Sequence, residues 1–249
     1  AGVCSAIGAA FAGDLAVTAS SGPGIALKSE ALGLAVMTEL PLVVVNVQRG
    51  GPSTGLPTKT EQSDLFQAMY GRNGECPLVV VTPATPSDCF NVLFEACKIA
   101  LEHMIPVMVL SDGYVANGSE PWMIPTVADL PQIKVSKATD PDGFMPYTHA
   151  EGTVARPWAT PGTPGLEHRI GGLEKENQTG NVNYDPDNHH YMNVHRQNKV
   201  DAIANYIPEA KVYGNDSGEL LVLGWGGTHG AIRSSVDRAQ KAGHSVSHL

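Results

Sequence analysis

The sequence predicts an α/β protein with a parallel sheet that carries helices on both of its faces. Residues 42–47 form an apolar, largely β-branched run, which is typical of a strand buried on both sides. Similar runs alternate with helical patterns of about 10 to 15 residues, as in βαβ units with right-handed crossovers. Several of these strands end in Gly-rich or Pro-rich loops, where open α/β sheets bind their ligands.

The first 130 or so residues hold the elements of this sheet. Small residues favour a helix at the start, and each later strand is a short apolar run between turn residues. The segment 83–87 (Pro-Ala-Thr-Pro-Ser) caps the last long helix. The expected elements are a helix over 1–12, a strand over 15–19, a helix over 25–38, a strand over 42–47, a helix over 61–69, a strand over 78–82, a helix over 88–103 and a strand over 107–110.

The character of the chain changes near Pro121. Residues 121–213 are rich in Pro, Gly, Asn and His, with little periodicity until a helix expected near 196–207. A segment of this length is unusual for a simple loop between two structural elements. We therefore expect it to cover a surface or a partner subunit. The last part of the chain is predicted to begin a second α/β domain, with a strand over 219–223, a glycine turn and a helix over 230–242. The expected division is 1–130, 131–215 and 216–249.

Composition narrows the functional classes. The chain has 249 residues, of which 42% are hydrophobic and 16% charged, which is typical of a protein with a sizeable core. Its 16 basic and 25 acidic residues give a net charge of −9 without a basic tract, so neither nucleic acid nor an anionic membrane is an expected partner. It has no long apolar run and no signal peptide, so we expect a soluble cytoplasmic protein.

The four cysteines do not form a CxxC pair. Cys89 and Cys97 lie eight residues apart on one expected helix, too far along it to be joined, and Cys4 and Cys76 stand alone. We therefore expect small buried thiols in a reducing compartment and no iron–sulfur cluster held by this chain.

Two strand ends carry the residue types of a ligand site. Arg49 directly follows the buried strand, where its guanidinium could grip a carboxylate or phosphate with two hydrogen bonds. Ser20 and Ser21 follow the preceding strand, where hydroxyls and backbone N–H groups at a helix start favour an anion or acceptor. Each alone could be a surface arginine or an ordinary cap, but two polar strand ends in successive units favour a shared site.

Three segments resemble one known family. They are residues 18–24 (Thr-Ala-Ser-Ser-Gly-Pro-Gly), 47–58 (Val-Gln-Arg-Gly-Gly-Pro-Ser-Thr-Gly-Leu-Pro-Thr) and 111–114 (Ser-Asp-Gly-Tyr). Together they resemble the alpha subunit of 2-oxoacid:ferredoxin oxidoreductases, in its 2-oxoglutarate branch, over nearly the whole chain. The chain begins within a helix and stops as a strand begins, so it resembles the central piece of a longer alpha subunit.

The resemblance implies a thiamine diphosphate-binding fold, with residues 1–130 as its pyrimidine domain and residues 216–249 as the beginning of a transketolase C-terminal-like domain. It implies oxidative decarboxylation of a 2-oxoacid, 2-oxoglutarate, to an acyl-coenzyme A and CO2, with electrons passed to ferredoxin. Thiamine diphosphate with Mg²⁺ would be shared with a beta subunit that also holds a [4Fe-4S] cluster, and coenzyme A would be the co-substrate. This chain would hold no metal itself.

The resemblance also implies site residues. Arg49 would meet the substrate carboxylate, and Arg72 could hold the second carboxylate of a dicarboxylate substrate. The remaining residues fall into a substrate-side loop, Thr54, Gly55 and Thr58, and a cofactor-side loop, Ser20, Ser21 and Gly22. No residue matches the family's catalytic glutamate, which would lie upstream of Ala1, so no catalytic residue is expected here. Glu30 and Glu39 are both expected on the exposed side of a helix.

Three further expectations concern residues outside this site. His189, His190 and His195 are expected to be surface histidines, since neither a capping carboxylate nor a regular helix is evident around them. The glycine turn at 224–228 supports an alternative function, a non-catalytic nucleotide-binding module, although it lacks the GxGxxG spacing. A subunit that only assembles others is a further alternative.

Overall fold

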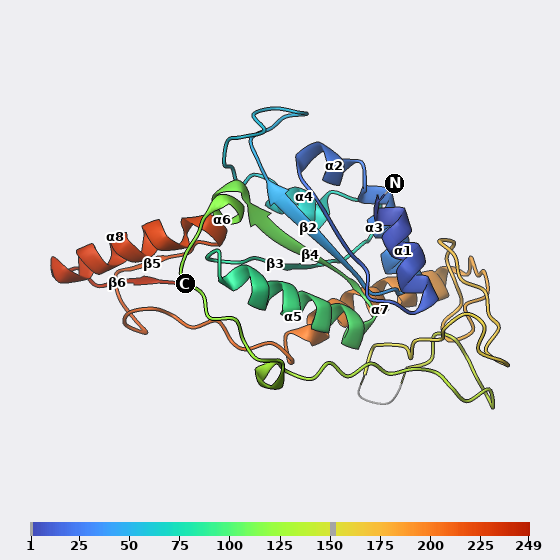
Figure 1. The fold of residues 1–249 in the computed structure, drawn as a ribbon. Coiled ribbons are helices and arrows are strands. Elements are labelled where there is room, and N and C mark those ends of the chain that lie inside the picture. Colours follow the sequence, from blue (N-terminus) through green and yellow to red (C-terminus); the bar gives the residue numbers. More distant parts are fainter. Residues whose placement is uncertain (1, 150–152) are drawn as a thin grey trace.

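A four-stranded parallel sheet forms the centre of the computed structural model, which describes residues 2–149 and 153–249 (Figure 1). Its strands lie in the order β1-β2-β4-β3. The elements of this part are α1 (Gly2–Ala12), β1 (Val17–Ser20), α2 (Gly22–Ala26), α3 (Ser29–Thr38), β2 (Leu42–Gln48), α4 (Leu65–Tyr70), β3 (Val79–Val81), α5 (Asp88–His103), β4 (Pro106–Asp112) and α6 (Gly113–Asn117). The expected α/β class with a parallel sheet is thus confirmed.

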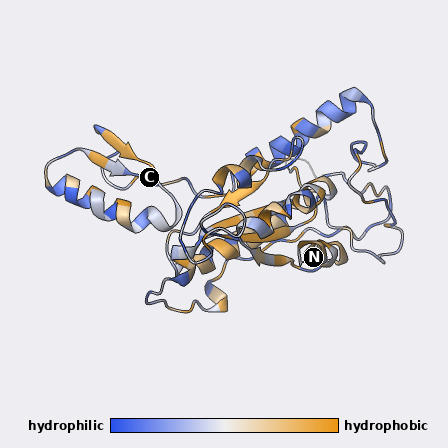
Figure 2. Cartoon of the chain, turned by 90° about the horizontal axis from the view of Figure 1, so that it is seen from above, coloured by the Kyte–Doolittle hydropathy of each residue, from blue (hydrophilic) through white to orange (hydrophobic). Residues whose placement is uncertain are grey.

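Helices cover both faces of the sheet, as expected. Leu42 and Val44 of β2 pack with Met108 and Leu110 of β4 into a core formed with α1, α3 and α4. The alternate residues of the same strands face a second core, formed with α5 and α7 (Pro186–Ile203). Successive side chains of a strand point to opposite faces, so a central strand must be apolar at nearly every position. Figure 2 shows this concentration of apolar residues on the sheet.

Two expected helices differ in the structure, one through a local turn and one through long-range contacts. The helix expected over 25–38 is divided in two, because a turn at Leu27 and Lys28 separates α2 from α3 and the Ser29 hydroxyl donates to Ala26 O at 3.0 Å. The helix expected from residue 61 begins only at Leu65. Gln62 and Asp64 are instead held by long-range hydrogen bonds to other parts of the chain.

The helix α7 begins ten residues before its expected start. Asp185 caps it by accepting hydrogen bonds from the N–H groups of Asp187 and Asn188, and Pro186 occupies its first turn. A capping Asp followed by Pro is a recognised helix-start signal, and it explains why the helix begins here. His189 and His190 are exposed, as expected, but the expectation that no regular helix surrounds the three histidines was wrong. His195 is buried on α7, where burial lowers its pKa to about 4.

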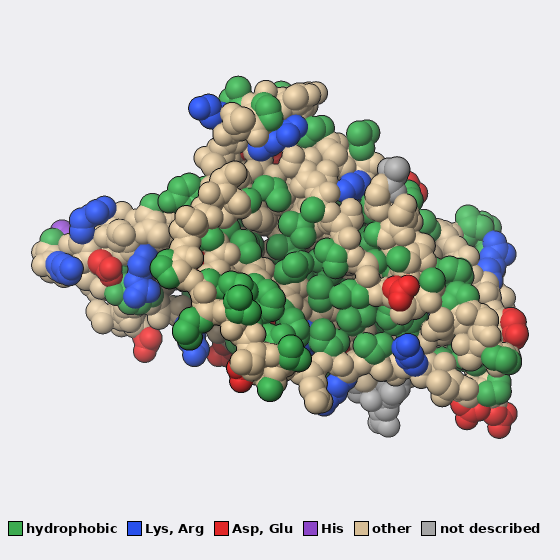
Figure 3. All heavy atoms as spheres, viewed as in Figure 1, with side chains coloured by type: hydrophobic (Ala, Val, Ile, Leu, Met, Phe, Trp, Pro, Cys, Tyr) green, Lys and Arg blue, Asp and Glu red, His purple; other side chains and the backbone are tan. Residues whose placement is uncertain are grey.

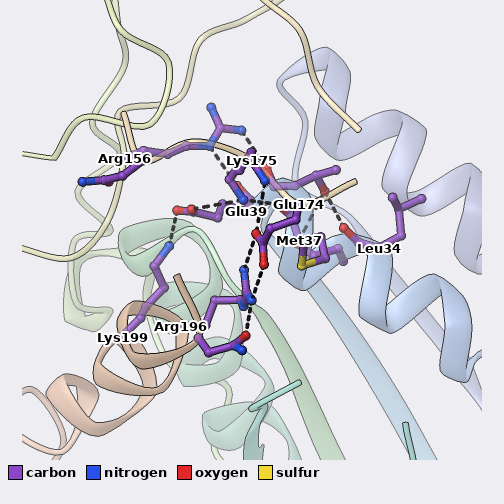
Figure 4. Close-up of polar contacts among 12 residues, drawn as sticks. Leu34, Met37, Glu39, Arg156, Glu174, Lys175, Arg196 and Lys199 are labelled. Atoms are coloured by element: carbon purple, nitrogen blue, oxygen red, sulfur yellow. Dashed lines mark hydrogen bonds and ion pairs between the residues drawn. The ribbon is translucent and has the colours of Figure 1, made fainter. Parts of the chain in front are cut away.

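A buried charged cluster joins the irregular segment and α7 to the sheet (Figure 4). Glu39, which follows α3, is 4% exposed and pairs with Lys199 of α7 and, at 3.9 Å, with Lys175. Lys175 and the buried Arg156 also donate to the last carbonyls of α3, at Met37, Thr38 and Glu39. Cations are favoured at the carboxyl end of a helix, where carbonyl groups lack partners. The expected exposed position of Glu39 was wrong.

A smaller unit lies at the carboxyl end of the sheet. It comprises β5 (Leu220–Val222), the 3-10 turn η2 (Gly226–Thr228), α8 (His229–Lys241) and β6 (Val246–His248), with β5 and β6 parallel. Asp112 accepts a hydrogen bond from Gly227 N at 2.9 Å, and Gln62 donates to Trp225 O at 2.8 Å. These two bonds fix the η2 turn against the ends of the strands.

Surface properties agree in part with the composition. Hydrophobic side chains gather across the middle of the face in Figure 3, while most charged side chains lie towards its edges. Within the described ranges, no helix is both long and apolar enough to cross a membrane. All four cysteines are free, but only Cys97 is buried and Cys4 is exposed, which corrects the expectation of four buried thiols.

Candidate functional site

A cavity of about 500 Å³ opens at the carboxyl ends of β1 and β2. Pairing of the parallel strands aligns these ends, since Ser20 pairs with Asn46 and Gln48 with Asp112. The lining residues are Ala19, Ser20, Ser21, Val47, Gln48, Arg49, Pro57, Thr58, Lys59, Gly113 and Asn117. The structure therefore brings together Arg49, Ser20, Ser21 and Thr58, which the sequence placed in one site.

Arg49 has unused hydrogen-bonding capacity in this cavity. Its Nε atom is buried and has no hydrogen-bond partner among the residues that the structure describes. A buried guanidinium N–H without a partner is costly. Arg49 as a whole is half-buried and lines the cavity, so a ligand there would meet the exposed part of its guanidinium. The site thus offers an anion a fixed, planar cation.

A buried polar network holds the strand end that carries Arg49. The Gln48 side chain is fully buried; it donates to Ser111 O at 3.0 Å and accepts from Asp64 N at 3.0 Å. Asn46 donates to the Asp64 carboxylate at 3.1 Å. Because the network ties β2 to β4 and to the start of α4, the backbone at Arg49 has little freedom to move. Polar residues inside an apolar strand were the sequence signal for this network.

The loop after Arg49 closes on itself. Gly50 N donates to Lys59 O at 3.0 Å and Leu56 N donates to Gly50 O at 2.8 Å. Gly55 has a φ of +52°, and a Cβ there would lie 2.2 Å from Gly50 O, so only glycine fits this turn. Thr54 and Gly55 lie exposed at the tip and do not line the cavity, and neither does Gly22.

Arg72 lies away from this site. Its guanidinium donates to the backbone carbonyls of Ala68, Met69 and Cys76, at 2.7 to 3.2 Å. It therefore closes the carboxyl end of α4 and the turn before β3, whereas Arg49 lies beyond the carboxyl end of β2. The structure does not bring Arg72 and Arg49 together.

Lys59 is a cavity residue that the sequence analysis missed. It lines the same cavity as Arg49, and no carboxylate of the described chain pairs with its ammonium group. Lys59 lies at the end of a glycine-rich loop, where no hydrophobic periodicity indicates which way a side chain points. Lys59 is exposed, and its flexible side chain can reach a second anionic group of a ligand that is bound beside Arg49.

No carboxylate lines this cavity within the described part of the chain. Glu39 precedes β2, and a strand of seven residues separates it from Arg49 by roughly 20 Å. Its pKa is lowered to about 2 by Lys199, Lys175 and Arg156, which outweigh the effect of burial. Glu39 is therefore a permanently ionised structural group at the opposite end of the sheet.

The glycine turn of η2 does not offer a free phosphate cradle. Its Gly227 N–H already donates to the Asp112 carboxylate, whose other oxygen accepts from the N–H groups of Tyr114 and Val115. A phosphate at this turn would face a carboxylate at close range, which is unfavourable. No group of three or more potential metal ligands occurs among the described residues.

The parallel sheet with helices on both faces and the cavity at its carboxyl edge define an α/β domain with a ligand-sized cavity at its strand ends. The chain belongs to the pyruvate flavodoxin/ferredoxin oxidoreductase family, whose thiamine diphosphate-binding domain model matches residues 1–185.

Individual relatives narrow the comparison. The chain is 55% identical over 248 residues to the 2-oxoglutarate oxidoreductase subunit KorA of Mycobacterium tuberculosis, covering 99% of this chain and 38% of that protein. It is 31% identical to the 2-oxoglutarate synthase subunit KorA of Methanothermobacter thermautotrophicus, covering 98% and 64%. A 2-oxoglutarate:ferredoxin oxidoreductase structure from Magnetococcus marinus, with 2-oxoglutarate, coenzyme A and succinyl-CoA bound, superimposes with a TM-score of 0.92 at 38% identity, covering 99% of this chain and 43% of that one. The chain thus spans less than two thirds of these proteins.

Proposed function

We propose that the chain is part of the alpha subunit of a thiamine diphosphate-dependent 2-oxoglutarate:ferredoxin oxidoreductase. The observation that carries this proposal is the Arg49 cavity, where a guanidinium with a buried, unpartnered N–H lies beside Ser20 and Ser21 at the ends of two parallel strands. Residues 1–130 would form the pyrimidine-side domain, 131–215 its covering segment and 216–249 the beginning of a second domain.

Each lining residue then has a defined task. Arg49 binds the carboxylate next to the oxo group and orients the substrate by two hydrogen bonds. Ser20 and Ser21 offer hydroxyl and backbone groups to the cofactor's aminopyrimidine ring, and the loop that ends at Thr58 limits access of water. Thiamine diphosphate, when bound, supplies the carbanion chemistry that decarboxylates a 2-oxoacid. We assign no catalytic carboxylate to the described residues, because none lines this cavity.

Lys59 would meet the distal carboxylate of 2-oxoglutarate. It lines the cavity that holds Arg49, whereas Arg72 is occupied by backbone carbonyls elsewhere. Two cations in one cavity match a dicarboxylate better than a substrate with one carboxylate. We therefore transfer to Lys59 the role that the sequence analysis gave to Arg72.

Other parts of the reaction are assigned to partners. A beta subunit would complete the thiamine diphosphate site with Mg²⁺ and carry the [4Fe-4S] cluster, coenzyme A would accept the acyl group, and ferredoxin would take the electrons. The apolar surface in Figure 3 supports association, since patches of this kind commonly mark interfaces. The four free thiols fit a reducing, cytoplasmic setting.

The proposal is tested with the complete alpha subunit co-expressed with its neighbouring subunit and loaded with thiamine diphosphate, Mg²⁺ and clusters. We expect reduction of ferredoxin or a viologen dye that depends on both 2-oxoglutarate and coenzyme A, with pyruvate turned over much more slowly. A loaded complex that oxidises no 2-oxoacid would refute the activity and favour the role of an assembly subunit.

Replacing Lys59 by Met should change the substrate preference of this complex. The loss of one hydrogen bond to a charged group corresponds to roughly 10- to 100-fold in KM for 2-oxoglutarate. The KM for 2-oxobutyrate, which lacks the distal carboxylate, should not change. Equal effects on both substrates would show that Lys59 does not read the second carboxylate, and the exposed Lys241→Met provides the control for loss of a charge.

A further inference from the structure

The buried charged cluster of Glu39, Arg156, Lys175 and Lys199 holds more positive than negative charge. Each of these residues is at most 4% exposed, and Glu39 supplies the only carboxylate of the four. The oxygens of Glu39 lie against Lys199 and, at 3.9 Å, against Lys175. A buried charge that no opposite charge compensates is costly, because water does not reach it. A further anion in this cluster would therefore stabilise it.

The neighbouring carboxylate of Glu174 does not compensate for this excess. It accepts hydrogen bonds from Arg196 at 3.2 and 3.1 Å, so its charge is already matched by a cation outside the cluster. The pKa of Lys175 agrees with a surplus of positive charge. Burial lowers this pKa to about 8, and the cations Arg196 and Lys199 act in the same direction, against the effect of Glu39.

Two buried donors at this cluster have no hydrogen-bond partner among the described residues. Arg156 uses Nε on Glu39 O at 3.3 Å and Nη2 on Thr38 O at 3.1 Å, whereas its Nη1 is unpartnered. Figure 4 shows one terminal nitrogen of the Arg156 guanidinium that has no dashed line and points away from Glu39. The second donor is the hydroxyl of Tyr147, a residue that is 3% exposed. Buried donors of this kind normally have an acceptor.

The ring of Tyr147 lies beside two of the cations. The central guanidinium carbon of Arg156 is 5.1 Å from the centre of the ring, and Lys175 Nζ is 4.5 Å from it. Burial raises the pKa of Tyr147 to about 12, so its hydroxyl keeps its proton and can donate it to an acceptor. Positive charge and unpartnered donors thus lie together at this place, which is the chemistry that an anion requires.

We propose that Arg156, Tyr147 and Lys175 together bind a small inorganic monoanion, chloride or bicarbonate, which holds the irregular segment against the end of α3. The burial of all three residues favours an ion of a few atoms over a phosphate ester, which would need a cavity open to solvent. This site lies at the opposite end of the sheet from Arg49, and the inference does not depend on the proposed function.

Bromide locates the site directly, because it replaces chloride and scatters X-rays anomalously. In crystals of the complete alpha subunit with its neighbouring subunit, grown in bromide, we expect an anomalous peak within hydrogen-bond distance of Arg156 Nη1 and of the Tyr147 hydroxyl. An ordered water at this place, or bromide only at exposed positions elsewhere, would overturn the proposal.

Thermal unfolding of the same complex measures the binding in solution. At constant ionic strength, replacing gluconate by chloride or by bicarbonate should raise Tm until the site is saturated. The ion that saturates the effect at the lower concentration is the preferred occupant. Tyr147→Phe keeps the ring beside Arg156 and Lys175 and removes the hydroxyl, so the concentration for half of the effect should rise roughly three- to tenfold. The exposed Tyr184→Phe is the matched control and should respond like the unsubstituted protein.

Two further results would contradict the anion site. Equal effects of gluconate, chloride and bicarbonate on the unsubstituted protein would show charge screening alone. A specific response that Tyr147→Phe leaves unchanged would place the ion elsewhere. Neither measurement uses turnover, so a complex that oxidises no 2-oxoacid would refute the proposed function without affecting the result for this site.

Discussion

Arg49→Ala should nearly abolish productive use of 2-oxoglutarate by the assembled enzyme. The guanidinium is the group at the end of β2 that can hold a carboxylate by two hydrogen bonds, and its Nε has no partner among the described residues. Loss of such a charged contact corresponds to about 2–5 kcal/mol, or roughly 30- to 4,000-fold in kcat/KM. The measurement is 2-oxoglutarate-dependent dye reduction at saturating coenzyme A.

Matched variants show whether the geometry or only the charge matters. Arg49→Lys keeps the charge without the planar pair of donors, so we expect partial recovery. Arg169→Ala removes an exposed arginine of the irregular segment and should leave kcat/KM unchanged. Arg72→Met should lower stability, because it releases carbonyls at the end of α4, but should not raise the KM for 2-oxoglutarate. Equal losses in Arg49→Ala and Arg169→Ala would contradict the assignment.

Glu39→Gln should strongly destabilise the chain. The carboxylate is buried between Lys175 and Lys199, with Arg156 nearby, so its loss leaves several buried cations without an anion. Removing one partner of a buried ion pair costs about 3–5 kcal/mol. Urea unfolding followed by circular dichroism measures the change. Glu30→Gln, an exposed acidic residue in the first turn of α3, should cost less than about 1 kcal/mol.

The dependence of the unfolding free energy on pH in the acid range gives an independent check on the stabilising role of Glu39. Its pKa is lowered from 4.5 to about 2 in the folded chain, so its ionised form stabilises the fold above pH 4.5. That contribution is lost as the pH falls from 4.5 towards 2, and Glu39→Gln should therefore flatten this part of the stability curve. Replacing Glu39, Lys175 and Lys199 together by Met should restore part of the lost stability, because two of the three buried cations are then removed with the carboxylate and only Arg156 stays charged. A triple variant less stable than Glu39→Gln would contradict this account.

Local sequence was sufficient for the sheet and for half of the site. Apolar runs such as 42–47 identified buried parallel strands, because a strand covered on both faces cannot alternate. Arg49, Ser20 and Ser21 stood out because polar residues interrupt such patterns where strands end, and parallel strands bring their ends to one edge. The family segments lie in these same places, so the resemblance and the periodicity pointed to one site.

Long-range contacts decided the rest. Glu39 looked like a solvent-facing helix residue, yet cations 117 to 160 positions away in the sequence bury it. Arg72 and Lys59 are both loop cations, and only the folded chain shows that one meets backbone carbonyls while the other lines the cavity. Hydrophobic periodicity indicates which face of its own helix or strand a residue occupies. Whether a charged side chain is buried and paired depends instead on which distant segment packs against that residue. The sequence therefore determined the strand ends and their cation, and the tertiary structure decided which other charges join them.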